Sequence, residues 1–148
     1  MENIDLKQKL ALLRKQSVFS QLSDKENEEL ASLLKEKHFE AGETVVNEGE
    51  LVDSVYLIVQ GKADVRHIRI QDGQPVITSV AKLKENDAIG LNESGFYSIS
   101  GVRTASVIAE THLVLLFLSV ASFHGFALMH QHVNEIMRRN AQKILLSD

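Results

Sequence analysis

The chain has 148 residues, a net charge of -4, one proline and no cysteine. This length allows one domain with a sizeable core, and the lack of cysteine excludes disulfides, thiolate metal sites and cysteine nucleophiles. No basic face is evident and the longest apolar run, residues 113–118, is too short for a membrane span, so we expect a cytoplasmic protein with no direct nucleic-acid or membrane partner.

Residues 1–36 are expected to form helices. Leucines recur at helical spacing behind Asn3, which is a possible N-cap. A second helix is expected to begin at Ser23, because its hydroxyl and the carboxylate of Glu26 have the spacing of a capping box.

Residues 37–118 change to short runs of β-branched and aliphatic residues separated by turns. The Asp72-Gly73 pair between two runs favours a tight hairpin. This spacing predicts a mainly β fold with flanking helices, an antiparallel β-roll (double-stranded β-helix, jelly-roll-like). The expected strands are residues 44–47, 54–59, 62–70, 76–83, 104–109 and 113–118.

Residues 119–148 return to helical spacing and complete a single domain spanning residues 1–148. In the last segment, four residues fall at alternating steps of four and three, which is an a/d seam that predicts a homodimer. The alternative is that this short apolar stripe packs on its own β-roll. The seam residues are Val133, Met137, Asn140 and Ile144.

Residues 89–105 form a glycine-bounded segment that ends in Arg103-Thr104-Ala105. A guanidinium can give a phosphate two parallel charge-assisted hydrogen bonds, which a lysine cannot. A small residue such as Ala105 lets backbone N–H groups approach an anion, and a helical turn after Gly90 would aim further N–H groups at it. The segment therefore has the features of an anion-binding loop.

The order of helices, β-roll, this segment and two further helices resembles the cyclic-nucleotide-binding domain family. The resemblance is carried by the runs Gly42 to Gly49 and Asp53 to Val65, which contain Glu-Gly and Asp-x-x-Tyr, and by the Arg-Thr-Ala end. It implies that Arg103 pairs with a cyclic phosphate. It also implies that the residue after Gly90 should be a glutamate that binds the ribose 2′-hydroxyl.

This chain departs from the family pattern because Leu91 stands at that glutamate position, and the loop is a few residues longer. Asn92 and Glu93 are the nearby substitutes if the loop winds differently. In relatives the threonine of Arg-Thr-Ala favours guanine, so Thr104 points toward cyclic GMP. An alternative reading is that Arg103 pairs with an acidic neighbour on the roll surface. The expected ligand-binding residues are Gly90, Leu91, Asn92, Glu93, Arg103, Thr104 and Ala105.

The resemblance implies a non-enzymatic sensor that binds cyclic AMP or cyclic GMP and signals to a protein partner through its C-terminal helices. The alternative is a ligand-free dimerisation or docking module with a decayed site. A cupin-type metalloenzyme would need a His-x-His pair on strands, whereas His130-Gln131-His132 lies beyond them. We therefore expect no metal and no cofactor. No helix-turn-helix follows the last segment, so the output is expected to pass to another polypeptide.

Overall fold

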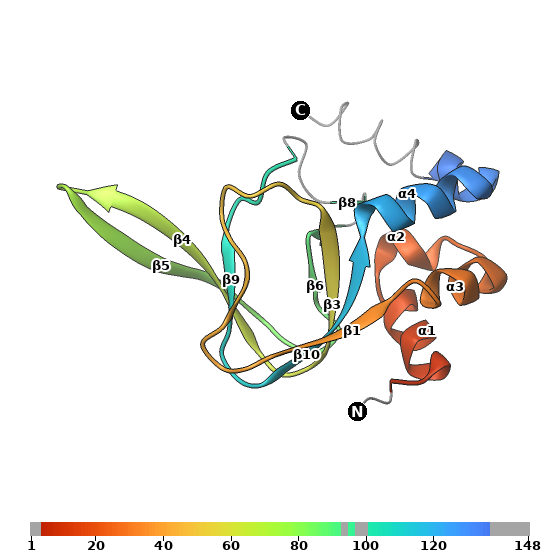
Figure 1. Ribbon diagram of the computed structural model, residues 1–148, viewed down its shortest axis with the longest axis horizontal. Coiled ribbons are helices and arrows are strands. Elements are labelled where there is room, and N and C mark those ends of the chain that lie inside the picture. The colour runs from red at the N-terminus through yellow and green to blue at the C-terminus, as the bar shows by residue number, and fades with distance from the viewer. Residues whose placement is uncertain (1–3, 93–94, 97–100, 137–148) are drawn as a thin grey trace.

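The computed structural model, which describes residues 4–92, 95–96 and 101–136, confirms an antiparallel β-roll flanked by helices (Figure 1). Two four-stranded sheets face each other, with orders β1-β10-β3-β6 and β2-β9-β4-β5. The first contains β1 (Lys35–Phe39), β10 (Leu113–Ser119), β3 (Ser54–Gln60) and β6 (Ala88–Ile89). The second contains β2 (Thr44–Val46), β9 (Ser106–Ala109), β4 (Ala63–Gln71) and β5 (Gln74–Leu83).

The central strand β3 is buried on both faces, which explains its nearly continuous apolar sequence. Because side chains alternate along a strand, Tyr56 and Ile58 enter the core between the two sheets, while Val55 and Leu57 enter a second core beneath the helices. Strand β3 thus contributes side chains to both cores. A substitution that shifts β3 in one core should therefore also disturb the packing of the other.

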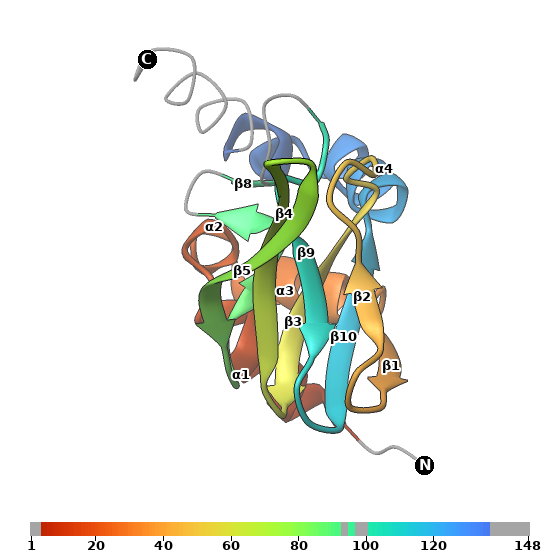
Figure 2. The ribbon, with the colours of Figure 1, turned by 90° about the vertical axis from the view of Figure 1, so that its left-hand side faces the viewer.

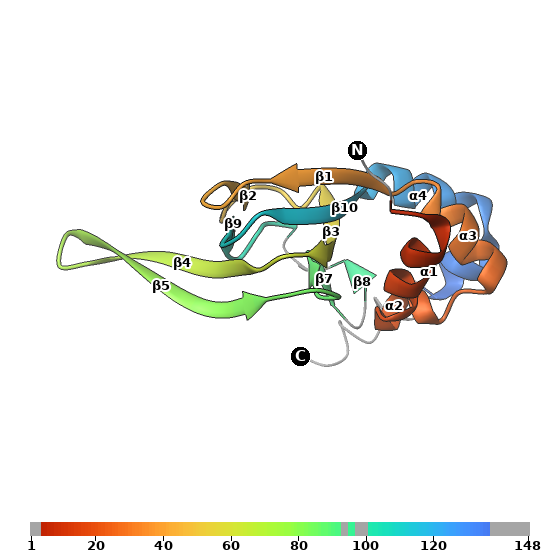
Figure 3. The ribbon, with the colours of Figure 1, turned by 90° about the horizontal axis from the view of Figure 1, so that it is seen from below.

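The hairpin of β4 and β5 turns at Asp72-Gly73, as expected. Both residues have positive φ, 52° and 77°, which matches the twist of a two-residue hairpin turn. The β4–β9 register ends at Arg66 with Ser106, so beyond that point β4 pairs with β5 alone. Figure 3 shows the result, a twisted two-stranded ribbon that projects past the rest of the roll.

The N-terminal helices are α1 (Leu6–Arg14), α2 (Ser17–Ser20) and α3 (Asp24–Ala31). The capping box of Ser23 and Glu26 is confirmed at the start of α3. The expected N-cap Asn3 is wrong, because Asp5 caps α1 and forms its own capping box. The expected helical boundary at residue 36 is also slightly wrong: β1 begins at residue 35 and adds an edge strand through its pairing with β10.

The last described elements are α4 (Val120–Met129) and a helical stretch from residue 131 to 136. Phe123 and Phe126 on α4 pack with Phe19 of α2, at ring-centroid distances of 5.8 Å for Phe19–Phe123 and 6.0 Å for Phe123–Phe126. Seen from the hairpin side, α1 and α3 lie behind the strands (Figure 2). Within the described residues, no helix is both long and apolar enough to cross a bilayer.

Candidate functional site

A cavity of about 190 Å³ opens in the roll beside the segment that the sequence singled out. Its wall is mostly aliphatic, and its polar side is supplied by the Arg-Thr-Ala end of that segment. Five of the seven expected ligand-binding residues line it together: Gly90, Leu91, Arg103, Thr104 and Ala105. The other lining residues are Val46, Val52, Val65, Leu83, Ala88, Ile89 and Val107.

Arg103 is the one charged side chain among the described residues of this wall, and it is only 6% exposed. Its Nη2 donates to the Ser54 carbonyl at 2.8 Å and to the Ser54 hydroxyl at 3.3 Å. Its ion pair with Asp53 is long, at 3.8 Å, and that carboxylate is largely exposed. The alternative of a simple ion pair on the roll surface therefore does not describe Arg103, because the guanidinium is buried and held mainly by Ser54.

The second terminal nitrogen of Arg103, Nη1, is buried and has no hydrogen-bond partner among the described residues. Burial lowers the pKa of Arg103 from its usual value, although nearby Tyr56, Asp53 and Glu50 oppose this shift. An arginine remains protonated under such conditions. The site thus holds a charged N–H donor that lacks an acceptor. Burying such a donor destabilises the folded state unless a ligand supplies the acceptor.

The backbone around Arg103 is fixed by the loop between β2 and β3. Arg103 N donates to Glu50 O at 2.7 Å, and Gly49 N donates to Arg103 O at 2.9 Å. Two residues away, Val52 N donates to Gly101 O at 2.7 Å. The Glu-Gly motif at residues 48–49 therefore contributes to the site indirectly, by holding the arginine in place.

Gly90 allows the arginine to lie where it does. Its φ is +86°, and a Cβ atom on it would lie 2.7 Å from Arg103 Nη1 and 3.1 Å from Ser54 O. Both the backbone conformation and the lack of a side chain are required here. Any larger residue would displace the guanidinium or distort β6.

Leu91 begins a short hairpin, which corrects the expected helical turn after Gly90. Strand β7 (Leu91–Asn92) pairs antiparallel with β8 (Gly95–Phe96), and Leu91 lies opposite Phe96. The Leu91 side chain is half-buried and packs against the apolar core beneath the helices. Of the two suggested substitutes, Asn92 is placed in β7 by its backbone, and Glu93 lies outside the described residues.

Thr104 is exposed at the cavity and Ala105 is half-buried. Ser54 and Asp53, which were not among the expected ligand-binding residues, are the direct neighbours of the guanidinium. A second hollow of about 590 Å³ lies on their side of Arg103. The Asp-Ser pair just before a buried strand was visible in the sequence, but only the fold brings it against residue 103.

The expected dimer seam is only partly described. Val133 is fully buried and belongs to the chain's own core beneath the helices, so it does not lie on an exposed seam. Met137, Asn140 and Ile144 lie outside the described residues. The homodimer stays a prediction, and Val133 is better explained by the alternative in which the stripe packs on its own domain.

Two histidines tie the C-terminal stretch to α3. His130 Nε2 lies 2.6 Å from Glu29 Oε2, and His132 Nδ1 lies 2.9 Å from Glu26 Oε1. Each histidine thus has its own carboxylate partner. Together with the buried Phe123 and Phe126, these pairs hold the C-terminal elements against the N-terminal helices.

The chain is similar to known proteins of one family. A family model described as the cyclic nucleotide-binding domain matches residues 36–130. A cAMP-dependent protein kinase regulatory subunit from Eremothecium gossypii is 30% identical over 132 residues, covering 86% of this chain and 25% of the relative. The chain thus spans about a quarter of the length of that curated relative.

The fold is shared with solved structures, including the following two. One is the N-terminal domain of a transcriptional regulator from Streptomyces coelicolor, with a TM-score of 0.75 and 23% identity over 92% of this chain and 91% of that one. The other is the regulatory subunit of a cAMP-independent protein kinase A from Trypanosoma brucei. It has a TM-score of 0.66 and 24% identity over 93% of this chain and 47% of that one.

Proposed function

Because the chain belongs to the cyclic nucleotide-binding domain family, we propose that it binds cyclic AMP or cyclic GMP in the cavity beside Arg103 and acts as a regulatory domain. The observation that carries this proposal is the buried guanidinium, whose Nη1 has no hydrogen-bond partner within the part of the chain that the structure describes. A cyclic phosphate would supply the missing acceptor. No catalytic role is proposed for the cavity.

Each part of the nucleotide would contact different residues of the cavity. Arg103 would pair with the cyclic phosphate, and Gly90 and Ala105 would let the anion approach the backbone closely. The exposed hydroxyl of Thr104 is available to a base, which suits guanine. The aliphatic wall would cover the apolar faces of the base and the sugar.

Leu91 makes the proposed binding weak. It offers no acceptor for the ribose hydroxyl, and a hydrogen bond to a charged group contributes about 1.5–3 kcal/mol, or roughly one to two decades of affinity. Asn92 and Glu93 remain proposed contributors from the following hairpin.

The output would pass through the C-terminal helices to a protein partner. Leu91 lines the cavity and also packs against the core that contains Phe123 and Phe126. A ligand that moves this leucine would therefore disturb the packing of α4. Only a ligand that prefers one arrangement of these helices over another can shift their populations.

The second candidate is a docking module that has lost its cyclic-nucleotide ligand. The same half-buried Leu91 favours it, because an apolar residue stands where a ribose acceptor is expected. The similarity to a regulatory subunit named cAMP-independent is compatible with this candidate.

Titration calorimetry with cyclic AMP, cyclic GMP and linear 5′-AMP separates the two candidates. We expect binding of a cyclic nucleotide, and at least a tenfold loss in Arg103→Lys, which keeps the charge but not the two parallel hydrogen bonds. Arg69→Lys is the matched control, because Arg69 is exposed and pairs with Glu48. Thermal melts verify that each variant is folded.

Two outcomes would contradict the proposal, the first in the binding itself and the second in the role of Arg103. The first is wild-type protein that binds none of the three ligands, which favours the docking module. The second is Arg103→Lys binding as tightly as wild type, which would mean that the phosphate lies elsewhere.

A further inference from the structure

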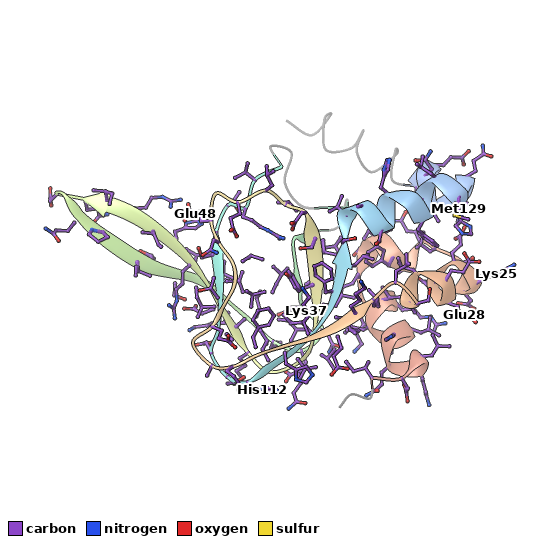
Figure 4. All side chains as sticks on the ribbon, in the orientation of Figure 1. Lys25, Glu28, Lys37, Glu48, His112 and Met129 are labelled. Carbon is purple, nitrogen blue, oxygen red and sulfur yellow. The ribbon has the colours of Figure 1, made fainter. Side chains whose placement is uncertain are left out.

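A cluster of histidines and carboxylates lies on the outer surface of the roll, away from the nucleotide cavity. Glu36, His38 and Glu40 occupy alternate positions along and just after β1, so they share one face of that strand. His112 ends the turn between β9 and β10, and it lies beside them because Phe39 pairs with Leu113. Figure 4 shows His112 at the lower edge of the roll, where β1 and β10 run together.

The four side chains form one continuous chain of contacts. His38 Nε2 is bonded to Glu36 Oε2, and His112 Nδ1 lies 3.1 Å from Glu40 Oε1. The two inner nitrogens, His38 Nδ1 and His112 Nε2, face each other at 3.3 Å. Each carboxylate thus contacts the outer nitrogen of its ring, His38 Nε2 or His112 Nδ1. The two inner nitrogens contact only each other among the described residues.

The hydrogens that the two rings carry limit how the inner nitrogens can pair. Each of the three contacts needs one hydrogen, but two neutral imidazole rings carry only two between them. If each outer nitrogen donates to its carboxylate, both inner nitrogens present lone pairs to each other. In that arrangement a metal ion between the rings can accept both lone pairs.

The geometry of the inner pair suits a metal ion. Two nitrogens that bind one tetrahedral zinc at about 2.05 Å are separated by about 3.3 Å, and their ring centroids lie about 5.2 Å apart. The His38 and His112 rings have centroids 5.3 Å apart. Carboxylates on the outer nitrogens are the usual partners that orient zinc-bound histidines.

The backbone beneath the pair is held firmly. Thr111 Oγ1 accepts from Lys62 N at 3.1 Å and donates to His112 O at 3.0 Å. Gly61 packs so closely that a Cβ atom on it would lie 2.3 Å from His112 O. The site is therefore held in place before an ion arrives, which lowers the cost of binding.

We propose that His38 and His112 form a two-histidine binding site for a divalent transition-metal ion of the zinc class, with Glu36 and Glu40 orienting the rings. Imidazole suits Zn²⁺, Cu²⁺ and Ni²⁺ better than Mg²⁺ or Ca²⁺. Among the described residues, no group of three or more histidine, aspartate or glutamate side chains could hold a metal, so water would complete the coordination. The metal-binding pattern weighed from the sequence, His130-Gln131-His132, does not include this pair.

Zinc titration of the full chain tests the proposal, with a chromophoric chelator as competitor. We expect one saturable Zn²⁺ per chain, at least a tenfold loss of affinity in His38→Asn and in His112→Asn, and a tenfold to hundredfold loss in Glu40→Gln. The matched control is His124→Asn, an exposed histidine on α4, which should bind zinc like wild type.

Histidine nitrogen chemical shifts in the wild-type protein provide a second readout that needs no variant. Zinc should shift His38 Nδ1 and His112 Nε2 and leave the nitrogens of His67 and His124 unchanged. Wild-type protein that binds no zinc would overturn the proposal. So would a His38→Asn/His112→Asn double variant that keeps wild-type affinity, or zinc-induced shifts confined to His130 and His132.

Discussion

Replacing Leu91 by glutamate would test the proposed binding site and the fold at the same time. In Leu91→Glu a carboxylate stands at the cavity wall, within the segment that leads to β7. If it accepts from a ribose hydroxyl, affinity for a cyclic nucleotide should rise by about tenfold, the lower end of the range for a charged hydrogen bond.

The same change should destabilise the domain. A fully buried leucine contributes about 1.5–3 kcal/mol, so half-buried Leu91 contributes about 1 kcal/mol through its packing on the helical core. Partial burial of a carboxylate costs a further ~1 kcal/mol. The free energy of unfolding should fall by about 1–2 kcal/mol, which lowers Tm by roughly 3–8 °C for a chain of this size.

Calorimetry and thermal melts on a short series separate these effects. Leu91→Gln supplies a neutral acceptor and should strengthen binding by less than the glutamate does, whereas Leu91→Met keeps the apolar volume and should change neither property by much. A folded Leu91→Glu protein that binds no tighter than wild type would refute the assignment of residue 91 as the ribose position.

Three further predictions concern stability. Asp64→Asn should cost about 1–2 kcal/mol at pH 7, because hydrogen bonds from Arg66 first, and then from Ser79 and Lys82, lower the pKa of Asp64 to about 2. This contribution is fully present above the unfolded pKa near 3.8 and is lost as pH falls toward 2. Urea unfolding should therefore show that the difference in unfolding free energy between wild type and Asp64→Asn shrinks below pH 4. A difference that stays constant with pH would contradict this prediction. Gly61→Ala should cost about 2 kcal/mol more than Gly42→Ala, since both have positive φ but only Gly61 meets a backbone oxygen; equal thermal shifts would reject this. Ser23→Ala should cost about 1 kcal/mol by opening the capping box, measured by urea unfolding, and a smaller loss than in an exposed control such as Ser32→Ala would count against it.

The sequence was sufficient for the architecture of the roll. Alternating apolar residues, Asp72-Gly73 and the capping box of Ser23 act over a few neighbouring positions, so their effects can be read locally. The boundary at β1 was missed because Lys35–Phe39 is a charged edge strand that forms only by pairing with β10. Similarly, Asp5 and Asn3 are both good caps, and the local pattern did not decide between them.

The candidate site also has a part that the sequence indicated and a part that only the folded structure shows. Arg103 and Gly90 were singled out by the Arg-Thr-Ala end and the glycine before it, which resemble the family pattern, and the fold places both residues at the cavity. Only the folded chain shows that Ser54 holds the guanidinium and that Leu91 joins the cavity to the helical core. These contacts join residues tens of positions apart, and the sequence carries no local signal for them.

The buried Val133 and the pair of His38 and His112 show the same limit. A heptad pattern shows that one face of a helix is apolar, but it does not show whether that face packs on its own domain or on a second chain. Likewise, two histidines 74 positions apart become neighbours only because β1 and β10 pair in one register. Local sequence therefore determined the elements and the charged residue of the site, whereas tertiary packing determined which distant side chains meet.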